Sequence, residues 1–127
     1  MIIDSSAVLA IFFRENGAEA LLSMILGAEF AGMGAPTATE TGLVLTGRLK
    51  HNATGSLLRF FQETGIEIVP FTDLHWQRAI DAYARFGKGR HPAALNFGDC
   101  MTYATAALAR QPLLCRGDFR KTDLELV

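Results

Sequence analysis

Short apolar runs alternate along the chain with longer segments in which apolar residues recur at helical spacing. The run at residues 66–69, Ile-Glu-Ile-Val followed by a proline, is the clearest predicted strand. Other strands are expected at residues 1–3, 30–33 and 113–115, with a short last one at 124–127. Helices are expected at residues 6–14, 18–27, 39–49, 53–64, 73–86 and 97–109. Because strands that alternate with helices form parallel βαβ units, this order predicts an α/β domain with a mainly parallel sheet.

The helix expected at residues 73–86 begins after an N-cap at Thr72 or Asp73. Its apolar residues recur at helical spacing, at Trp76, Ala79, Ile80 and Tyr83. We interpret the aromatic residues of this helix and the preceding one as core packing and not as platforms for stacking bases: Phe60, Phe61, Trp76, Tyr83 and Phe86. An exposed subset of them would instead form a groove for a partner.

Composition narrows the class of protein. The 127 residues predict a single domain, residues 1–127, and a content of 50% hydrophobic and 20% charged residues excludes a disordered chain. A formal net charge of −1 excludes a strongly basic coat for nucleic acid. The longest apolar run, residues 7–13, is far shorter than the roughly 18 residues of a membrane span. Cys100 and Cys115 lie in segments predicted to be core, which favours a reduced, cytoplasmic protein.

Four acidic residues occupy similar places in the predicted layout. Asp4 ends the first strand, Glu40 and Asp99 fall in the first turns of helices, and Asp118 follows the strand at 113–115. Strand carboxyl ends and helix N-termini share one edge of a parallel sheet, where ligands bind in such folds. Carboxylates gathered there would repel one another unless they held a cation. Oxygen ligands favour Mg²⁺ or Mn²⁺ over zinc.

Each of these acids also fits an ordinary structural role. A carboxylate in the first turn of a helix is stabilised by the helix dipole and by capping. The capping interpretation applies to Thr37-x-x-Glu40, Asn96-x-x-Asp99, Asp4 before the next helix, and a turn at Gly117-Asp118. Spacing alone leaves both interpretations open.

Three stretches of the chain carry a family resemblance. The chain opens with MIIDSSAVLAIF, residues 85–106 are RFGKGRHPAALNFGDCMTYATA, and residues 113–127 are LLCRGDFRKTDLELV. They resemble PIN-domain proteins, and among these the VapC-type toxins of bacterial toxin–antitoxin modules. The resemblance covers the whole chain. It implies a three-layer α/β/α fold and a Mg²⁺- or Mn²⁺-dependent endoribonuclease site at the carboxyl ends of the strands.

The resemblance carries over to individual residues. Asp4, Glu40 and Asp99 match the first three family acids, as metal ligands and catalytic residues. Ser6 matches the small hydroxyl residue that follows the first acid, and Asn96 matches a polar residue before the third, with a positional role.

The fourth acid departs from the family pattern. Related toxins often have one more residue between the glycine and the phenylalanine than this chain has in Gly117-Asp118-Phe119. Asp118 is the best match because it directly precedes Phe119, and Asp123 is the alternative.

The mechanism implied is hydrolysis of an RNA phosphodiester. Two ions about 3.5–4 Å apart would activate a water and stabilise the leaving oxygen, which predicts 5′-phosphate and 3′-hydroxyl products. Basic residues near the acids would bind RNA phosphates. The expected substrate-binding set consists of four of them and one serine: Arg85, Lys88, Arg90, Arg116 and Ser6. Further basic residues lie around them, at Arg78, Arg110, Arg120 and Lys121, and His91 is expected to make a loop contact and not to bind a metal.

The partners implied by the resemblance are a small antitoxin and a second copy of this chain. A non-catalytic PIN-like module that binds RNA or a partner is the alternative function. A phosphoacceptor receiver domain is excluded, because Asp4 precedes Ser5-Ser6 where that class pairs acids, and the strand at 66–69 ends in Pro70-Phe71 where it requires an aspartate.

Overall fold

The computed structural model of the chain describes residues 1–117 and 119–127. Within them, four short strands form one sheet in the order β3-β2-β1-β4, and every neighbouring pair is parallel. The strands are β1 (Ile2–Ile3), β2 (Gly32–Gly34), β3 (Glu67–Val69) and β4 (Leu113–Leu114). The parallel sheet expected from the alternation of elements is therefore confirmed.

The first strand lies in the interior of the sheet. Ile2 is in register with Gly32 of β2 on one side and with Leu113 of β4 on the other. The backbone N–H of Asp4 continues this pairing by donating to the carbonyl of Leu114 at 2.9 Å. The residue directly after β1 is thus bonded to β4, at the carboxyl edge of the sheet.

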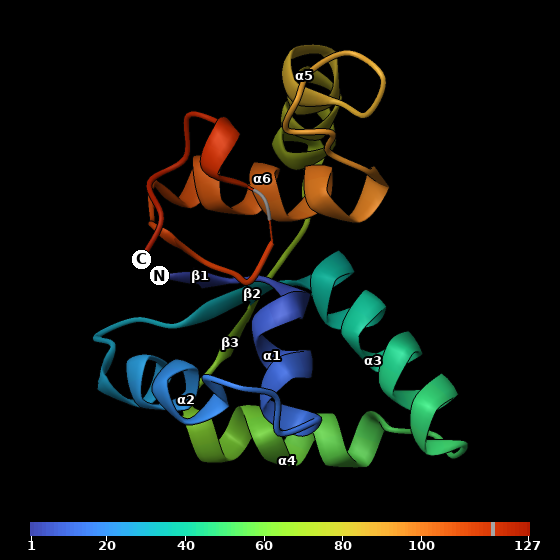
Figure 1. Cartoon of the computed structure of the whole chain (residues 1–127), viewed down its shortest axis with the longest axis vertical. Coiled ribbons are helices and arrows are strands. Elements are labelled where there is room, and N and C mark those ends of the chain that lie inside the picture. The colour runs from blue at the N-terminus through green and yellow to red at the C-terminus, as the bar shows by residue number, and fades with distance from the viewer. Residues whose placement is uncertain (118) are drawn as a thin grey trace.

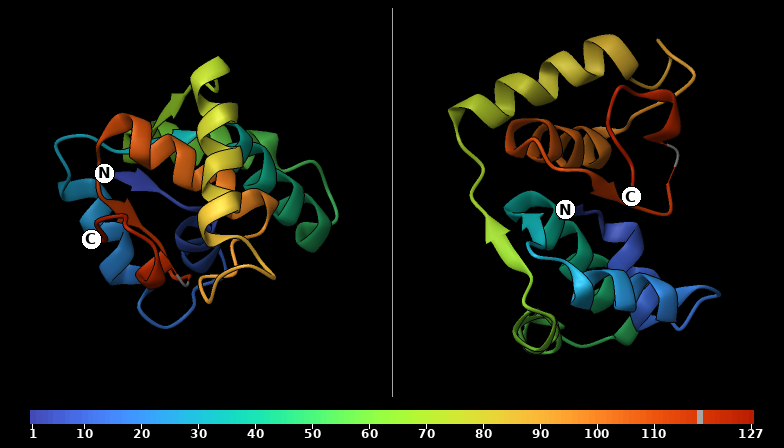
Figure 2. Two further views of the ribbon diagram at one scale, coloured as in Figure 1. Left: turned by 90° about the horizontal axis from the view of Figure 1, so that it is seen from above. Right: turned by 90° about the vertical axis from the view of Figure 1, so that its left-hand side faces the viewer.

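Helices cover both faces of this sheet (Figures 1 and 2). The bounds of the helices are α1 (Ser5–Phe12), α2 (Ala18–Gly27), α3 (Ala35–Leu49), α4 (Thr54–Thr64), α5 (Asp73–Phe86) and α6 (Phe97–Ala109), with a 3₁₀ turn η1 at Phe119–Lys121. In Figure 1, α5 and α6 lie above the sheet, α1, α2 and α4 lie below it, and α3 descends on that lower side. The arrangement is the expected three-layer α/β/α fold.

Alternation along the strands separates the core into two halves, because successive strand side chains point to opposite faces. Ile2 and Leu113 pack with α5 and α6, whereas Ile3 and Leu114 pack with the helices of the other layer. The sheet therefore separates two clusters of the core, one on each of its faces.

Helix α3 begins earlier than its sequence pattern predicts. It starts at Ala35 after an N-cap at Gly34, with Pro36 in the first turn where proline's fixed φ suits a helix. Glu40 consequently lies beyond the first turn, so the expected first-turn placement and the Thr37-x-x-Glu40 capping box are both wrong. Thr37 is instead buried between α3 and α6.

The aromatic residues were predicted as core, and this is wrong for two of them. Phe61 and Phe86 are buried, but Trp76 is 51% exposed and Tyr83 is 43% exposed. Helix α5 turns Ala79, Ala82 and Phe86 toward its neighbours, which leaves the Trp76 flank facing solvent.

Two smaller expectations are also met in part. The segment predicted as a last strand at 124–127 makes one isolated parallel bridge, between Leu113 and Leu126. Cys100 is buried as expected, while Cys115 is half-buried, and both are free thiols.

Across the described residues, no helix has the length and apolar character that crossing a bilayer requires.

Candidate active site

Among the predicted acids that the structure describes, Asp4 is the most enclosed, with 5% of the residue exposed. It caps α1, and its Oδ2 accepts from the Ser6 backbone N–H at 3.0 Å and from the Ser6 hydroxyl at 2.6 Å. Its Oδ1 accepts from the hydroxyl of Thr102 at 2.9 Å. Capping and burial in the site are therefore compatible roles of one residue.

Glu40 lies on α3 and contacts Ser5, the residue that follows Asp4. Its Oε1 accepts from the Ser5 hydroxyl at 2.7 Å. Its Oε2 approaches Gly98 in the first turn of α6 so closely that a Cβ at that position would overlap it. The Glu40 carboxylate thus lies against α6, the helix that carries Asp99.

Asp99 lies in the first turn of α6 and completes a capping box with Asn96. The Asn96 side chain accepts from the Asp99 backbone at 2.9 Å, and Asp99 Oδ2 accepts from the Asn96 backbone at 3.0 Å. Burial raises the pKa of the Asp99 carboxyl, and the negative charges of Asp4 and Glu40 raise it further, against the lowering effect of the Asn96 bond. The carboxylates of Asp4 and Glu40 therefore act electrostatically on that of Asp99.

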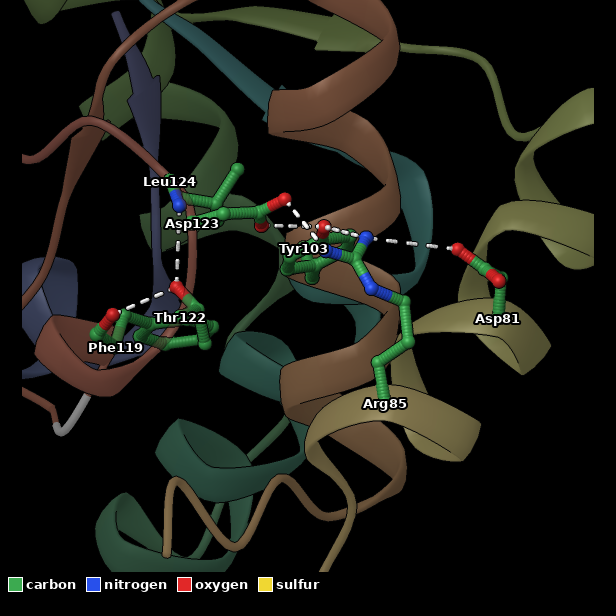
Figure 3. A network of polar contacts seen from close by, with 7 residues as sticks. All are labelled: Asp81, Arg85, Tyr103, Phe119, Thr122, Asp123 and Leu124. Carbon is green, nitrogen blue, oxygen red and sulfur yellow. Dashed lines mark hydrogen bonds and ion pairs between the residues drawn. The ribbon is translucent and has the colours of Figure 1, made fainter. Parts of the chain in front are cut away.

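The fourth predicted acid, Asp118, lies outside the described residues. Its alternative, Asp123, takes part in a polar network shown in Figure 3. One oxygen of Asp123 accepts from the Tyr103 hydroxyl at 2.7 Å, and the other accepts from Arg85 at 2.9 Å. The Tyr103 bond, more than the Arg85 contact, lowers the pKa of Asp123. Asp123 is therefore engaged in tying the C-terminal segment to α5 and α6.

Two residues of the predicted substrate-binding set lie beside Asp4. Ser6 donates its hydroxyl to Asp4 and accepts the backbone N–H of Arg116 at 2.9 Å, so it links the turn after β4 to the carboxylate. The Arg116 guanidinium pairs with Glu15 at 3.0 Å. Arg116 also lines a cavity of about 600 Å³ with the residues Leu113, Cys115, Gly117, Arg120, Leu126 and Val127.

The other predicted substrate contacts lie on α5 and the loop that follows it. Arg85 bonds to Asp123 and lies 3.8 Å from Asp81, and the Arg90 guanidinium sits 5.7 Å from the centre of the Tyr83 ring. Lys88 is exposed in the same loop. His91 accepts from the Ala93 backbone at 3.0 Å, as expected for a loop contact. In the described part of the chain, none of these basic residues bonds to the three carboxylates.

The donor set suits a hard divalent cation, since all three side chains offer carboxylate oxygens and repel one another without a counter-charge. Among residues 1–117 and 119–127, however, no three His, Cys, Asp or Glu side chains lie close enough together to hold an ion as they stand.

The sequence analysis singled out Ser6 and Asn96, but it missed four other residues that contact the carboxylates or their hydrogen-bond partners. These are Ser5, Thr37, Gly98 and Thr102. One signal was available, because threonines at positions predicted to be buried in an otherwise small, apolar helix need hydrogen-bond partners.

Comparison with known proteins assigns the family. The PIN domain profile matches residues 1–123. The chain is 48% identical over 127 residues to VapC ribonuclease Mb2004c of Mycobacterium bovis, which covers 98% of this chain and 91% of the relative. It is equally similar to Ribonuclease VapC36 of Mycobacterium tuberculosis, and 36% identical to Ribonuclease VapC of Mycolicibacterium smegmatis over 100% of this chain and 99% of the relative.

Solved structures agree on the fold. VapC20 of Mycobacterium tuberculosis, described as a toxin that cleaves the sarcin-ricin loop, superposes with a TM-score of 0.77 at 15% identity, covering 99% of this chain and 97% of the other. VapBC2 of Rickettsia felis, solved bound to a promoter DNA fragment, gives 0.74 at 15% identity, with coverages of 99% and 96%. With this fold, these acids and relatives at this identity, the chain belongs to the PIN-domain family and, within it, to the VapC ribonucleases.

Proposed function

We propose that this protein is a metal-dependent endoribonuclease that acts as the toxin of a toxin–antitoxin pair. One observation carries the proposal: carboxylates from three separate elements lie at one edge of the sheet, where Glu40 contacts both Ser5, which follows Asp4, and Gly98, which precedes Asp99. Gathering like charges costs stability unless the site uses them. The relatives named VapC ribonucleases support the same activity.

We assign Asp4, Glu40 and Asp99 as the ligands of Mg²⁺ or Mn²⁺, with Asp118 as the fourth acid. When bound, such an ion supplies charge neutralisation at the scissile phosphate and an activated water. The chain's own part is orientation: Ser6 bonds to Asp4, Ser5 bonds to Glu40, and Asn96 bonds to Asp99.

RNA is the proposed substrate, which places the activity in the cytoplasm. Arg116 is the best-placed phosphate contact, because its backbone bonds to Ser6 and Ser6 bonds to Asp4. Its guanidinium would have to leave Glu15 before it could bind a phosphate. Lys88 and Arg90 would extend the contact surface along the exposed loop after α5. Arg85 would have to leave Asp123 before it could bind a phosphate.

A small antitoxin and a second copy of this chain are the proposed protein partners. Structural neighbours include a toxin–antitoxin complex from Klebsiella pneumoniae, with a TM-score of 0.73 at 17% identity, covering 99% of this chain and 95% of the other. An antitoxin side chain carrying positive charge would pair with the carboxylates and block the site. The second copy would cover apolar side chains beside Glu40, which include Leu43, Val44, Phe97 and Met101.

The test is cleavage of a panel of structured RNAs by the purified protein with Mg²⁺, with Mn²⁺, or with EDTA. We expect cleavage with either metal and none with EDTA, leaving 5′-phosphate and 3′-hydroxyl ends. Asp4→Asn and Asp99→Asn should each lower the rate by about 100-fold or more, because each removes several kcal/mol of stabilisation. Glu63→Gln is the matched control, since Glu63 is exposed on α4.

Cleavage that persists in EDTA, or products with 2′,3′-cyclic phosphate ends, would contradict the mechanism. A protein that neither cleaves the panel nor binds Mn²⁺ would favour the alternative, a non-catalytic PIN-like module that binds RNA or a partner.

A further inference from the structure

A buried threonine on α6 holds one oxygen of the Asp4 carboxylate. Thr102 is fully buried and its hydroxyl donates to Asp4 Oδ1 at 2.9 Å. A threonine hydroxyl has a single proton to donate, and that proton is committed to Asp4. The second contact of the Thr102 hydroxyl, with the Thr37 hydroxyl at 3.1 Å, is therefore one in which Thr37 donates. The two hydroxyls form a directed chain from Thr37 through Thr102 to Asp4.

The two hydrogen bonds, from Thr37 to Thr102 and from Thr102 to Asp4, join the three elements that supply the acids. Thr37 lies on α3 one turn before Glu40, and Thr102 lies on α6 one turn after Asp99. Asp4 follows β1 directly. A change in the separation of α3 and α6 would lengthen one of the two bonds, so the hydroxyls couple the helix positions to the orientation of Asp4.

The hydrogen bond between Thr102 and Asp4 is buried, so its loss would cost more free energy than the loss of a bond at the surface. Thr37 and Thr102 are both buried, and a buried acceptor that loses its donor suffers the cost of its desolvation without compensation. Hydrogen-bond partners of metal-binding carboxylates fix the direction in which their oxygens point, and removing them weakens metal binding by about 10–100-fold in known sites.

We propose that Thr102 is a positioning residue for the Asp4 carboxylate, and that Thr37 orients the Thr102 hydroxyl for this purpose. The inference rests on the proposed function, because it assigns the held carboxylate to a divalent cation. It adds two residues that touch neither the substrate nor the cation.

Three variants separate positioning from packing. Thr102→Val keeps the shape of the side chain and removes the hydroxyl, whereas Thr102→Ser keeps the hydroxyl. Thr105→Val is the matched control, because Thr105 is buried on the same helix and its hydroxyl bonds to the Met101 carbonyl at 3.0 Å, within the helix. Mn²⁺ binding is measured by titration calorimetry on the full chain, and the midpoint of urea unfolding is measured for each variant.

We expect Thr102→Val to bind Mn²⁺ about 10–100-fold more weakly than the wild type, and Thr102→Ser and Thr105→Val to remain within about threefold. Thr37→Val should show a smaller loss, since the Thr102 hydroxyl then still donates to Asp4. Equal Mn²⁺ affinity in Thr102→Val and the wild type would overturn the inference, as would a loss that serine does not restore in a variant with wild-type unfolding.

The readouts also distinguish this inference from the function on which it rests. A wild-type protein that binds Mn²⁺ but cleaves no RNA would contradict the proposed function, while the comparison of affinities would still decide the role of Thr102. A wild-type protein that binds no Mn²⁺ would overturn both.

Discussion

Gly98 has no Cβ atom, and this allows the Glu40 carboxylate to lie against α6. Its Cα faces Oε2 of Glu40, and no side chain larger than hydrogen fits between them. The residue is not needed for backbone freedom, because it lies in the regular first turn of α6. Its value is the close approach that it allows between a carboxylate on α3 and the helix carrying Asp99.

Gly98→Ala is therefore expected to change function without unfolding the protein. The added methyl group must displace the Glu40 carboxylate, which is the free end of a flexible side chain and can move at little cost in stability. Alanine in place of glycine in a helix favours folding by up to about 1 kcal/mol. We expect RNA cleavage to fall by about tenfold or more, with urea unfolding unchanged or slightly improved.

The control is Gly47→Ala on α3, where an added methyl group meets nothing within 4 Å. It should gain the same stability and keep full cleavage activity. If Gly98→Ala cleaved RNA at the wild-type rate, Glu40 would not need its observed position.

Single residues were predicted well where their role is local. Asp4 and Asp99 were expected as caps and as site acids, and the structure shows the capping bonds of both. Thr102 was missed because its partner Asp4 lies 98 positions away, and the local pattern indicates only that a buried threonine needs some hydrogen-bond partner.

At the scale of elements, the C-terminal segment is fastened to α5 and α6 by the network of Figure 3. Tyr103 donates to Asp123, and Arg85 bonds to both of them. Burial, and then the bond to Asp123, raises the pKa of Tyr103 to about 12. Removing the hydroxyl in Tyr103→Phe should lower the free energy of unfolding by about 1 kcal/mol, the usual worth of such a bond.

This network also predicts how stability depends on pH. The pKa of Asp123 is lower in the folded chain than its ordinary 3.8, so its contribution is present above that value and is lost as the pH falls through the folded pKa. The pKa of Tyr103 is raised, so its contribution is present below about 10 and is lost as the pH rises through about 12.

Asp123→Asn should therefore be less stable than the wild type at pH 7, and the two should converge in strongly acidic solution. Urea unfolding at several pH values measures this difference. Asp81→Asn serves as the control, because Asp81 lies 3.8 Å from Arg85 in an exposed pair of the kind that contributes under about 1 kcal/mol. A constant difference between Asp123→Asn and the wild type from acid to neutral pH would contradict the assignment.

Elements were predicted best where both of their ends carry a signal. The bounds expected for three helices match the structure: α2, α5 and α6. The start of α3 was missed because Pro36 was not recognised as a first-turn residue. The outward flank of α5 was missed because helical spacing alone does not say which stripe of an apolar helix faces the core.

For the whole molecule, the most informative surface is the apolar groove beside Glu40. Leu43 is 70% exposed and Phe97 is 81% exposed, and both line this groove of about 560 Å³. Large apolar side chains exposed together are costly in water and typical of interaction surfaces. In the proposed function, this face is the one that a second copy of the chain would cover.

Leu43→Lys should then shift the protein from dimer to monomer in sedimentation velocity experiments. Leu26→Lys is the control, because Leu26 is 57% exposed on α2 and does not line the groove. A wild-type protein that sediments as a monomer at every concentration would contradict the assignment, and so would equal dissociation by the two variants.

The gathering of the acids at one edge could be predicted from the rule for parallel sheets, and the order of the strands could not. That order depends on which strands pair, which is decided by contacts across the chain. The strand with the clearest pattern, β3, lies at the edge of the sheet, while the two-residue β1 lies inside it.

The pairing of β1 with β4 also bears on the synthesis of this protein. Asp4 and Glu40 are synthesised early, whereas Asp99, Thr102 and the strand β4 that bonds to Asp4 are synthesised much later. Contacts between such distant parts of a chain cannot form until both ends are present. A chain synthesised only as far as α5 therefore lacks Asp99 and the Thr102 contact to Asp4, and the candidate site assembles only after α6 and β4 have been made.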